Sequence, residues 1–280
     1  MDVTFLSNNV KLAGHLYVPE SYKEGEKLPG IVVAHPGGGE LSKQGFITLA
    51  FDRSTQGASE GTPRYIEDPY ASVEDIKSAV TYLSTSDKVD ASRIGALGVC
   101  AGGGYSLAAA SADRRVKAVA GVSMVCTGRL FTAVPKETLD ALITQAGEAR
   151  IEYAKTGNPK YFPYVAPLTN DSPVLMKEAT DYYLTPRGGH PRSVNKFASW
   201  SYDILPSYDS FDKIERISPR PLLLIAGSTS DTLHFSETAI EKASGPKELF
   251  TIEGATHIDL YDRKADQAVP KLAEFYKSNL

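Results

Sequence analysis

Apolar and polar positions follow two patterns along the chain, and together these predict an α/β protein. Short apolar runs such as residues 31–34 have the length and composition of strands that are buried on both faces of a parallel sheet. Between such runs lie segments with one apolar face, such as residues 72–83, where apolar side chains recur at helical spacing from Val73 to Leu83. Strands alternating with helices in this way are typical of a mostly parallel sheet covered by helices.

The same patterns assign most of the chain to elements. The expected strands are residues 3–5, 11–18, 31–34, 46–51, 94–99, 116–124, 221–227 and 248–252, of which the first two alternate like a half-exposed antiparallel pair. The expected helices are residues 72–83, 105–112, 136–155, 173–184, a segment from residue 236, and 264–278. Residues 127–212 contain no convincing buried strand, which predicts a helical cap inserted after the sixth strand. The expected domains are therefore a sheet core at 1–126, the cap at 127–212 and the rest of the core at 213–280.

The connection after the third expected strand is unusually short. Parallel neighbours need a crossover of about a dozen residues, usually with a helix, whereas residues 40–45 provide at most one helical turn. Either this helix is reduced to a remnant, or the sequence omits a segment near Gly39 and Glu40. We favour the second alternative, because residues 41–45 look like the end of a helix with its Gly cap.

Composition and charge narrow the class of protein. Of the 280 residues, 42% are hydrophobic and 23% charged, which is ordinary for a folded globular protein. The net charge is −4, with 30 basic and 34 acidic residues mixed along the chain, so no nucleic-acid partner is expected. The first residues lack the basic and apolar stretches of a signal peptide, and no apolar run is long enough to span a membrane. We therefore expect a cytoplasmic protein that does not bind a membrane.

The strongest local signal for chemistry is Gly-Val-Cys-Ala-Gly at residues 98–102, between a buried strand and a helix. This is the spacing of a nucleophile elbow, with Cys100 where serine usually stands. The glycines leave room for a sharp, strained turn, and the helix N-terminus below it favours a thiolate, which should lower the pKa of the thiol. The alternative is an inert cysteine buried in a Gly-rich helix start.

An acid and a base follow in the order that such an elbow requires. Asp231 comes just after the strand at 221–227, and His257 comes after the strand at 248–252. The order nucleophile, acid, histidine predicts that His257 deprotonates Cys100, while Asp231 fixes the tautomer of His257. Each residue taken alone could be an ordinary loop residue. Asp259 is a rival acid, but it lies on the wrong element.

Main-chain N–H groups should stabilise the oxyanion of the reaction. The N–H that follows the nucleophile belongs to Ala101. A second N–H is expected from the loop His-Pro-Gly-Gly-Gly at residues 35–39, where Gly37 is the first choice and Gly38 the second, since Pro36 has no N–H. A flexible turn or a phosphate-binding loop is the alternative, although no phosphate-binding motif follows.

These motifs together resemble the α/β-hydrolase superfamily over nearly the whole chain. Within it, the loop at 35–39, Phe51-Asp52 with Gly-Ala-Ser-Glu-Gly at 57–61, Gly-Val-Cys-Ala-Gly-Gly-Gly at 98–104 and Glu-Gly-Ala-Thr-His at 253–257 look like the dienelactone-hydrolase-like branch. Bacterial YcjY-type hydrolases and fungal polyketide transferases are similar. The resemblance implies an eight-stranded, mostly parallel sheet and ester-type chemistry without a cofactor. The short crossover after the third strand departs from the family pattern.

A cysteine nucleophile restricts the substrate class. The acyl-enzyme is a thioester, which suits esters, lactones and thioesters, whereas an amide would expel the thiolate instead of the amine. The aromatic residues Trp200, Tyr202 and Tyr65 line the substrate in one interpretation and pack the cap on the core in the other. We interpret Cys126 as structural.

The sequence therefore predicts a hydrolase that cleaves an ester, lactone or thioester through Cys100, His257 and Asp231. An acyltransferase passing the acyl group to an alcohol or amine is the first alternative, and a non-catalytic ligand-binding member of the fold is the second. The expected partner is a small-molecule acyl substrate, with no cofactor or metal, and a homodimer is compatible with these properties.

Overall fold

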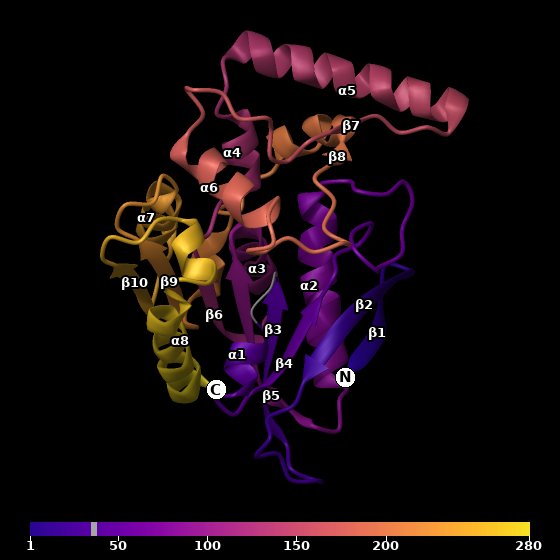
Figure 1. The fold of residues 1–280 in the computed structure, drawn as a ribbon. Helices are drawn as coiled ribbons and strands as arrows, with labels where there is room; N and C mark the ends of the chain where they lie inside the picture. The colour runs from indigo at the N-terminus through magenta and orange to yellow at the C-terminus, as the bar shows by residue number, and fades with distance from the viewer. Residues whose placement is uncertain (35–37) are drawn as a thin grey trace.

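The computed structural model, which describes residues 1–34 and 38–280, contains one eight-stranded sheet in the order β1-β2-β4-β3-β5-β6-β9-β10 (Figure 1). Strands β1 and β2 pair antiparallel, as do β2 and β4, and every other neighbouring pair is parallel. The strands of the sheet are β1 (Asp2–Ser7), β2 (Val10–Tyr17), β3 (Leu28–Ala34), β4 (Ile47–Phe51), β5 (Val89–Val99), β6 (Val116–Val122), β9 (Leu222–Gly227) and β10 (Lys247–Ile252). The predicted eight-stranded, mostly parallel sheet with an antiparallel start is confirmed.

Helices cover both faces of this sheet because its central strands alternate between two apolar layers. In β3, Val32 and Ala34 pack toward α2 and α3, while Ile31 and Val33 pack toward α1 and α8. The helices are α1 (Gly38–Ser42), α2 (Pro69–Ser84), α3 (Ala101–Ala112), α4 (Thr127–Thr132), α5 (Lys136–Thr156), α6 (Val174–Tyr183), α7 (Leu233–Lys242) and α8 (Ala265–Asn279). None of the helices in the described residues is long and apolar enough to cross a membrane. The cytoplasmic location stays a prediction.

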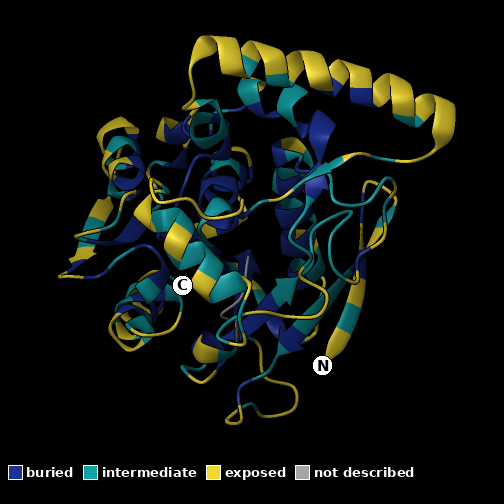
Figure 2. Cartoon of the chain, turned by 45° about the horizontal axis from the view of Figure 1, so that its top comes forward, coloured by how far each residue is buried: buried dark blue, intermediate teal, exposed yellow. Residues whose placement is uncertain are grey.

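The chain between β6 and β9 forms a layer of helices beyond one end of the sheet, where Figure 1 shows α4, α5 and α6. Most of α5 faces solvent (Figure 2), and Ala146 and Ala149 are its buried residues. Two strands of two residues each, β7 (Tyr161–Phe162) and β8 (Phe197–Ala198), pair antiparallel in this layer. The sequence analysis expected no strand here, since two residues are too few to show an alternating pattern. The division into core and cap at residues 127 and 212 stays a prediction.

The connection from β3 to β4 is as short as the sequence indicates. Of the residues in the connection that the structure describes, the helical ones are the five of α1. Leu41 of α1 is buried in the apolar layer beside α8. The short helix α1 thus still covers this part of the sheet. The interpretation that the sequence omits a segment near Gly39 and Glu40 stays a prediction.

Candidate active site

The turn between β5 and α3 holds Cys100 in a strained backbone conformation. The backbone of Cys100 has φ 55° and ψ −125°, a combination that residues other than glycine rarely adopt. A Cβ atom at Gly98 would lie 2.0 Å from the carbonyl oxygen of Gly102, and a Cβ at Gly102 would lie 2.3 Å from the carbonyl oxygen of Ala34. Glycine is therefore required on both sides of the turn, as the sequence analysis inferred from the spacing.

Hydrogen bonds of the main chain fix this turn against β6 and the start of α4. The Cys100 N–H donates to the Val122 carbonyl at 3.0 Å, and the Cys100 carbonyl accepts from the Val125 N–H at 3.0 Å. The N–H of Ala101 donates toward the Cys100 sulfur, as expected for the first residue of a helix, whose N–H has no partner within the helix. The N–H of Ala101, the predicted oxyanion donor, thus lies beside the Cys100 side chain. Gly37 lies outside the described residues, and Gly38 is the first residue of α1.

The electrostatics of Cys100 differ from the sequence expectation. Burial raises the pKa of the Cys100 thiol, and this outweighs the hydrogen bonds from Tyr261 and Ala101, which favour the thiolate. The lowered thiol pKa expected from the helix N-terminus is therefore wrong for this structure. The thiol is protonated at neutral pH, and an attack by Cys100 requires that its proton be removed.

His257 is brought to this turn by two loops that pack tightly together. The loops after β9 and β10 touch at Gly227, where a Cβ would lie 2.1 Å from the Ala255 carbonyl oxygen. The Thr229 N–H donates to the same carbonyl at 3.1 Å. On the other side, the Ser123 hydroxyl donates to the His257 carbonyl at 2.8 Å, which ties this loop to the end of β6. The histidine is thus fixed next to β6, whose end also holds the turn at Cys100.

The imidazole of His257 is buried and has a hydroxyl group at each nitrogen. Its Nδ1 lies 2.5 Å from Thr232 Oγ1, and its Nε2 lies 2.7 Å from the hydroxyl oxygen of Tyr261. The side chain is almost inaccessible to solvent, with 2% of the residue exposed. Burial lowers the pKa of His257 to about 4, so the ring is neutral at pH 7.

The structure does not bring Asp231 to His257. Asp231 is exposed, and its Oδ2 accepts a hydrogen bond from the N–H of Leu175 at 3.1 Å, in the first turn of α6. A carboxylate is stabilised there by the helix N-terminus. Thr232, the next residue, occupies the position at Nδ1 where the acid was expected. The rival Asp259 accepts from the Thr256 N–H at 3.1 Å within its own loop.

Tyr261 is a residue of this site that the sequence analysis missed. Besides its contact with His257, its hydroxyl lowers the pKa of the Cys100 thiol, against the effect of burial, and interacts with the hydroxyl of Tyr183 at the end of α6. Among the described residues, no direct hydrogen bond joins Cys100 to His257. The spacing in the sequence could have indicated Tyr261, because this residue lies four positions after His257. The short helix η4 (Ile258–Tyr261) turns the Tyr261 side chain back toward the imidazole.

A second group of buried polar side chains also acts on Cys100, and the sequence analysis missed it as well. Arg53 donates to both carboxylate oxygens of Glu67, at 2.9 and 3.1 Å, and the hydroxyls of Tyr105 and Tyr164 donate to the same carboxylate. Burial pushes the pKa of Glu67 up, but the Arg53 charge and these hydrogen bonds outweigh burial and lower it to about 2. This ionised group contributes to the electrostatics at Cys100. We call it the charged cluster.

The aromatic residues proposed for substrate binding lie in the layer above the sheet. Trp200 is buried against α5, with its ring centroid 5.2 Å from that of Tyr153, which corresponds to the packing interpretation. Tyr202 packs against Phe131, and Tyr65 packs edge-on against Tyr161. A role for these three residues in binding the substrate stays a prediction. Cys126 is buried and accepts a hydrogen bond from the Ser210 N–H, in keeping with a structural role.

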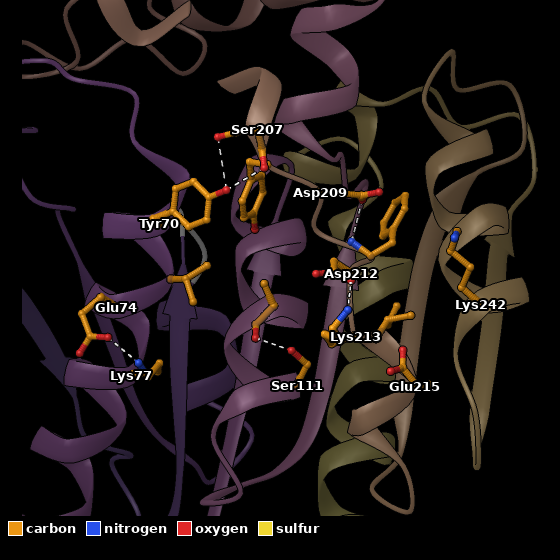
Figure 3. Close-up of a pocket in the computed structure, with 15 residues that line it drawn as sticks. Tyr70, Glu74, Lys77, Ser111, Ser207, Asp209, Asp212, Lys213, Glu215 and Lys242 are labelled. Atoms are coloured by element: carbon orange, nitrogen blue, oxygen red, sulfur yellow. Dashed lines mark hydrogen bonds and ion pairs between the residues drawn. The ribbon is translucent and has the colours of Figure 1, made fainter. Parts of the chain in front are cut away.

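A groove of about 830 Å³ lies away from this site, between α2, α3 and the segment that precedes β9. Figure 3 shows Tyr70 and Ser207 at one side of it, where the Tyr70 hydroxyl donates to the Ser207 carbonyl at 2.7 Å. The residues that line the groove include neither Cys100 nor His257. The chemistry inferred above therefore does not belong to this groove.

Comparison with known proteins agrees with the fold. Residues 31–270 match the model of the alpha/beta hydrolase family. Protein PA2218 of Pseudomonas aeruginosa is 36% identical over 298 residues, which cover 99% of this chain and 80% of that protein. Its crystal structure superposes with a TM-score of 0.94, covering 100% of this chain and 93% of the solved one. Protein YcjY of Escherichia coli is 34% identical, covering 99% of this chain and 98% of that protein.

A fungal enzyme is a more distant relative. The polyketide transferase grgF from a Penicillium species is 26% identical over 246 residues, covering 86% of this chain and 81% of that protein. Its crystal structure superposes with a TM-score of 0.85 over the whole of this chain and 98% of the solved chain. The resemblance to YcjY-type proteins and to polyketide transferases is therefore confirmed at the level of similarity.

Proposed function

Because this chain belongs to the alpha/beta hydrolase family, we propose that it is an enzyme that cleaves an ester, lactone or thioester with Cys100 as the nucleophile. The observation that carries the proposal is the backbone of Cys100. Its positive φ, between two glycines that permit no Cβ, holds the thiol at the start of α3 beside the Ala101 N–H. A strained nucleophile at a strand-to-helix turn is the central feature of acyl transfer in this fold.

The first half of the reaction forms an acyl-enzyme. His257 takes the proton of the Cys100 thiol, and the thiolate attacks the carbonyl carbon of the substrate, so that a C–S bond forms and the carbonyl π electrons move to oxygen. The Ala101 N–H donates to this oxyanion. When the intermediate collapses, the bond to the leaving oxygen or sulfur breaks, and the leaving group takes the proton from His257. A thioester on Cys100 remains.

The second half transfers the acyl group to an acceptor. His257 removes a proton from water, which attacks the thioester carbonyl, and the C–S bond breaks as Cys100 recovers the proton. An alcohol or amine can attack in the same way, and the name of the fungal relative, polyketide transferase, supports transfer as the second candidate function. Hydrolysis and transfer share every step up to the thioester.

Asp231 is the proposed acid of the triad on the strength of its place in the chain. In the structure its carboxylate is held by the Leu175 N–H, and Thr232 holds the Nδ1 of His257. Asp231 would reach the ring only after releasing α6, and it would then stabilise the imidazolium, which a neutral hydroxyl does far less well.

Hydrolysis of p-nitrophenyl acetate and an acyl-thioester panel tests the role of Cys100. Cys100→Ala should abolish turnover, and Cys100→Ser should retain part of the esterase activity. Cys126→Ala is the matched control, since the Cys126 sulfur is buried and accepts a hydrogen bond from the Ser210 N–H, and this variant should keep the activity of the unmodified protein. Full hydrolysis by Cys100→Ala contradicts the proposal.

The adduct on Cys100 separates the remaining alternatives. Intact mass after exposure to each acyl donor should show one acyl group on the unmodified protein and none on Cys100→Ala. Products formed in water with a competing alcohol then assign hydrolysis or transfer. Failure of Cys100 to react with any donor and with iodoacetamide supports a non-catalytic ligand-binding protein.

A further inference from the structure

The hydroxyl of Tyr261 lies between the two groups that must exchange a proton. It is 2.7 Å from Nε2 of His257. It also interacts with the thiol of Cys100, whose pKa it lowers against the effect of burial. The proton of the thiol therefore has no direct hydrogen-bonded route to His257 among the described residues. Any route between them that follows the observed contacts passes through this hydroxyl.

Tyr261 is held in this position from several sides. Its ring packs edge-on against His257 and against Tyr182, with ring centroids 5.5 and 5.3 Å apart. Its hydroxyl hydrogen-bonds Tyr183. The next residue, Asp262, accepts two hydrogen bonds from Arg187, each at 2.7 Å. These contacts come from α6 and the segment after it, so the cap holds Tyr261 against the catalytic pair.

We propose that Tyr261 is a catalytic residue that relays the proton from Cys100 to His257. The thiol proton passes from Sγ to the phenolic oxygen while the phenolic proton passes to Nε2. The products are a thiolate, a neutral tyrosine and an imidazolium, so that charge and atoms balance. The inference rests on the proposed role of Cys100 as the nucleophile.

In the proposed relay the two proton transfers occur together. Burial raises the pKa of the Tyr261 phenol and of the Cys100 thiol, so neither a free phenolate nor an isolated thiolate is stable here. A concerted relay forms no phenolate. It leaves the thiolate and the imidazolium as an ion pair that is bridged by a neutral hydroxyl, which donates to the thiolate.

Alkylation of Cys100 by iodoacetamide tests the relay without an acyl substrate. The rate follows the thiolate fraction, so its dependence on pH reports the pKa of the thiol. For Tyr261→Phe we expect the apparent pKa to rise by about one and the rate at pH 7 to fall about tenfold, since the thiolate loses its donor and its link to His257. Tyr153→Phe is the matched control, because it removes a hydroxyl from an aromatic side chain that packs on Trp200 and not on Tyr261, and its profile should be unchanged.

A double-variant cycle shows whether His257 acts through Tyr261. His257→Ala should slow alkylation in the unmodified protein but add nothing to Tyr261→Phe, because the link is already broken. Additive effects, or a Tyr261→Phe protein that is alkylated at the original rate or faster, would overturn the relay. The faster rate would mean that Tyr261 only separates the pair.

A second variant keeps the test independent of folding. With 3-fluorotyrosine at position 261, the hydroxyl is retained and becomes a stronger donor, so the apparent pKa of Cys100 should fall. A rise or no change contradicts the relay. The proposed function is judged separately: turnover by Cys100→Ala refutes the nucleophile, whereas an inactive Cys100→Ala with an unaffected Tyr261→Phe refutes only the relay.

Discussion

Two groups of polar side chains meet at Cys100. One of them is ionised, and the other is neutral. The charged cluster is built on the ion pair of Arg53 and Glu67, and the Glu67 pKa falls to about 2 although burial opposes this. The second group, which we call the neutral line, runs from Cys100 through Tyr261 and His257 to Thr232. There burial prevails, the thiol keeps its proton, and the His257 pKa falls to about 4.

The difference between the two groups lies in their partners. A guanidinium at bonding distance compensates a carboxylate for the water it loses, so the pair stays ionised. The neutral line has only hydroxyl groups around the imidazole, so it contains no opposite charge that would stabilise an ion until a proton moves within the line. The charged cluster is therefore suited to stabilising the fold, and the neutral line is suited to transferring a proton.

Removing the carboxylate of the charged cluster should produce the largest change. Glu67→Gln leaves the buried guanidinium of Arg53 without its counter-charge, so the free energy of unfolding should fall by about 3–5 kcal/mol. Urea unfolding followed by Trp200 fluorescence measures it.

A surface ion pair is the control for this variant. Asp140→Asn breaks the pair of Asp140 with Lys136, whose side chains are 57% and 81% exposed, and should change the unfolding free energy by less than about 1 kcal/mol. Equal effects of the two variants would show that the burial of the charged cluster is not what makes it strong.

A second prediction concerns whether the Asp231 carboxylate contacts His257, a member of the neutral line, during turnover. If Asp231 reaches His257, Asp231→Asn should lower turnover about a hundredfold, because the imidazolium loses its counter-charge. Asparagine keeps a carbonyl oxygen for the Leu175 N–H, so α6 retains its contact. Thr232→Val should cost less than about tenfold, since a neutral hydroxyl contributes a single hydrogen bond. Turnover of both variants is measured with one substrate. A larger loss in Thr232→Val than in Asp231→Asn would show that Thr232, and not Asp231, is the partner of His257 during turnover.

The smallest effect concerns the pH dependence of stability. The unfolded chain binds a proton at His257 below about pH 6.5, whereas the folded protein does so only near pH 4. The unfolded state therefore gains protons first as the pH falls, and the unfolding free energy should drop by about 2 kcal/mol between pH 7 and pH 5. In His257→Gln this part of the pH dependence should vanish, and a persisting slope would place its origin elsewhere.

The sheet and the elbow could be predicted from the sequence because both depend on local patterns. Apolar runs such as residues 31–34 mark buried strands, and the steric demand at Gly98 and Gly102 is visible in the spacing of the glycines. The choice between Asp231 and Thr232 could not be predicted, because the residues are adjacent and both follow β9. Which one faces the ring depends on α6, which lies more than fifty residues earlier in the chain.

The charged cluster and Tyr261 were missed for a related reason. Arg53, Glu67, Tyr105 and Tyr164 come from four separate segments, and no motif links them. The raised pKa of Cys100 likewise depends on how far the folded chain buries the thiol, which local spacing does not record.

The attachment of α6 has a consequence for attempts to redesign this protein. Its first turn is held by Asp231 and the segment after it by Asp262, and these residues directly adjoin Thr232 and Tyr261, the two partners of the histidine. An exchange of α6 for a helix from a relative, intended only to admit another substrate, would also alter the basicity of His257. Substrate range and proton affinity are therefore not independent design variables in this chain.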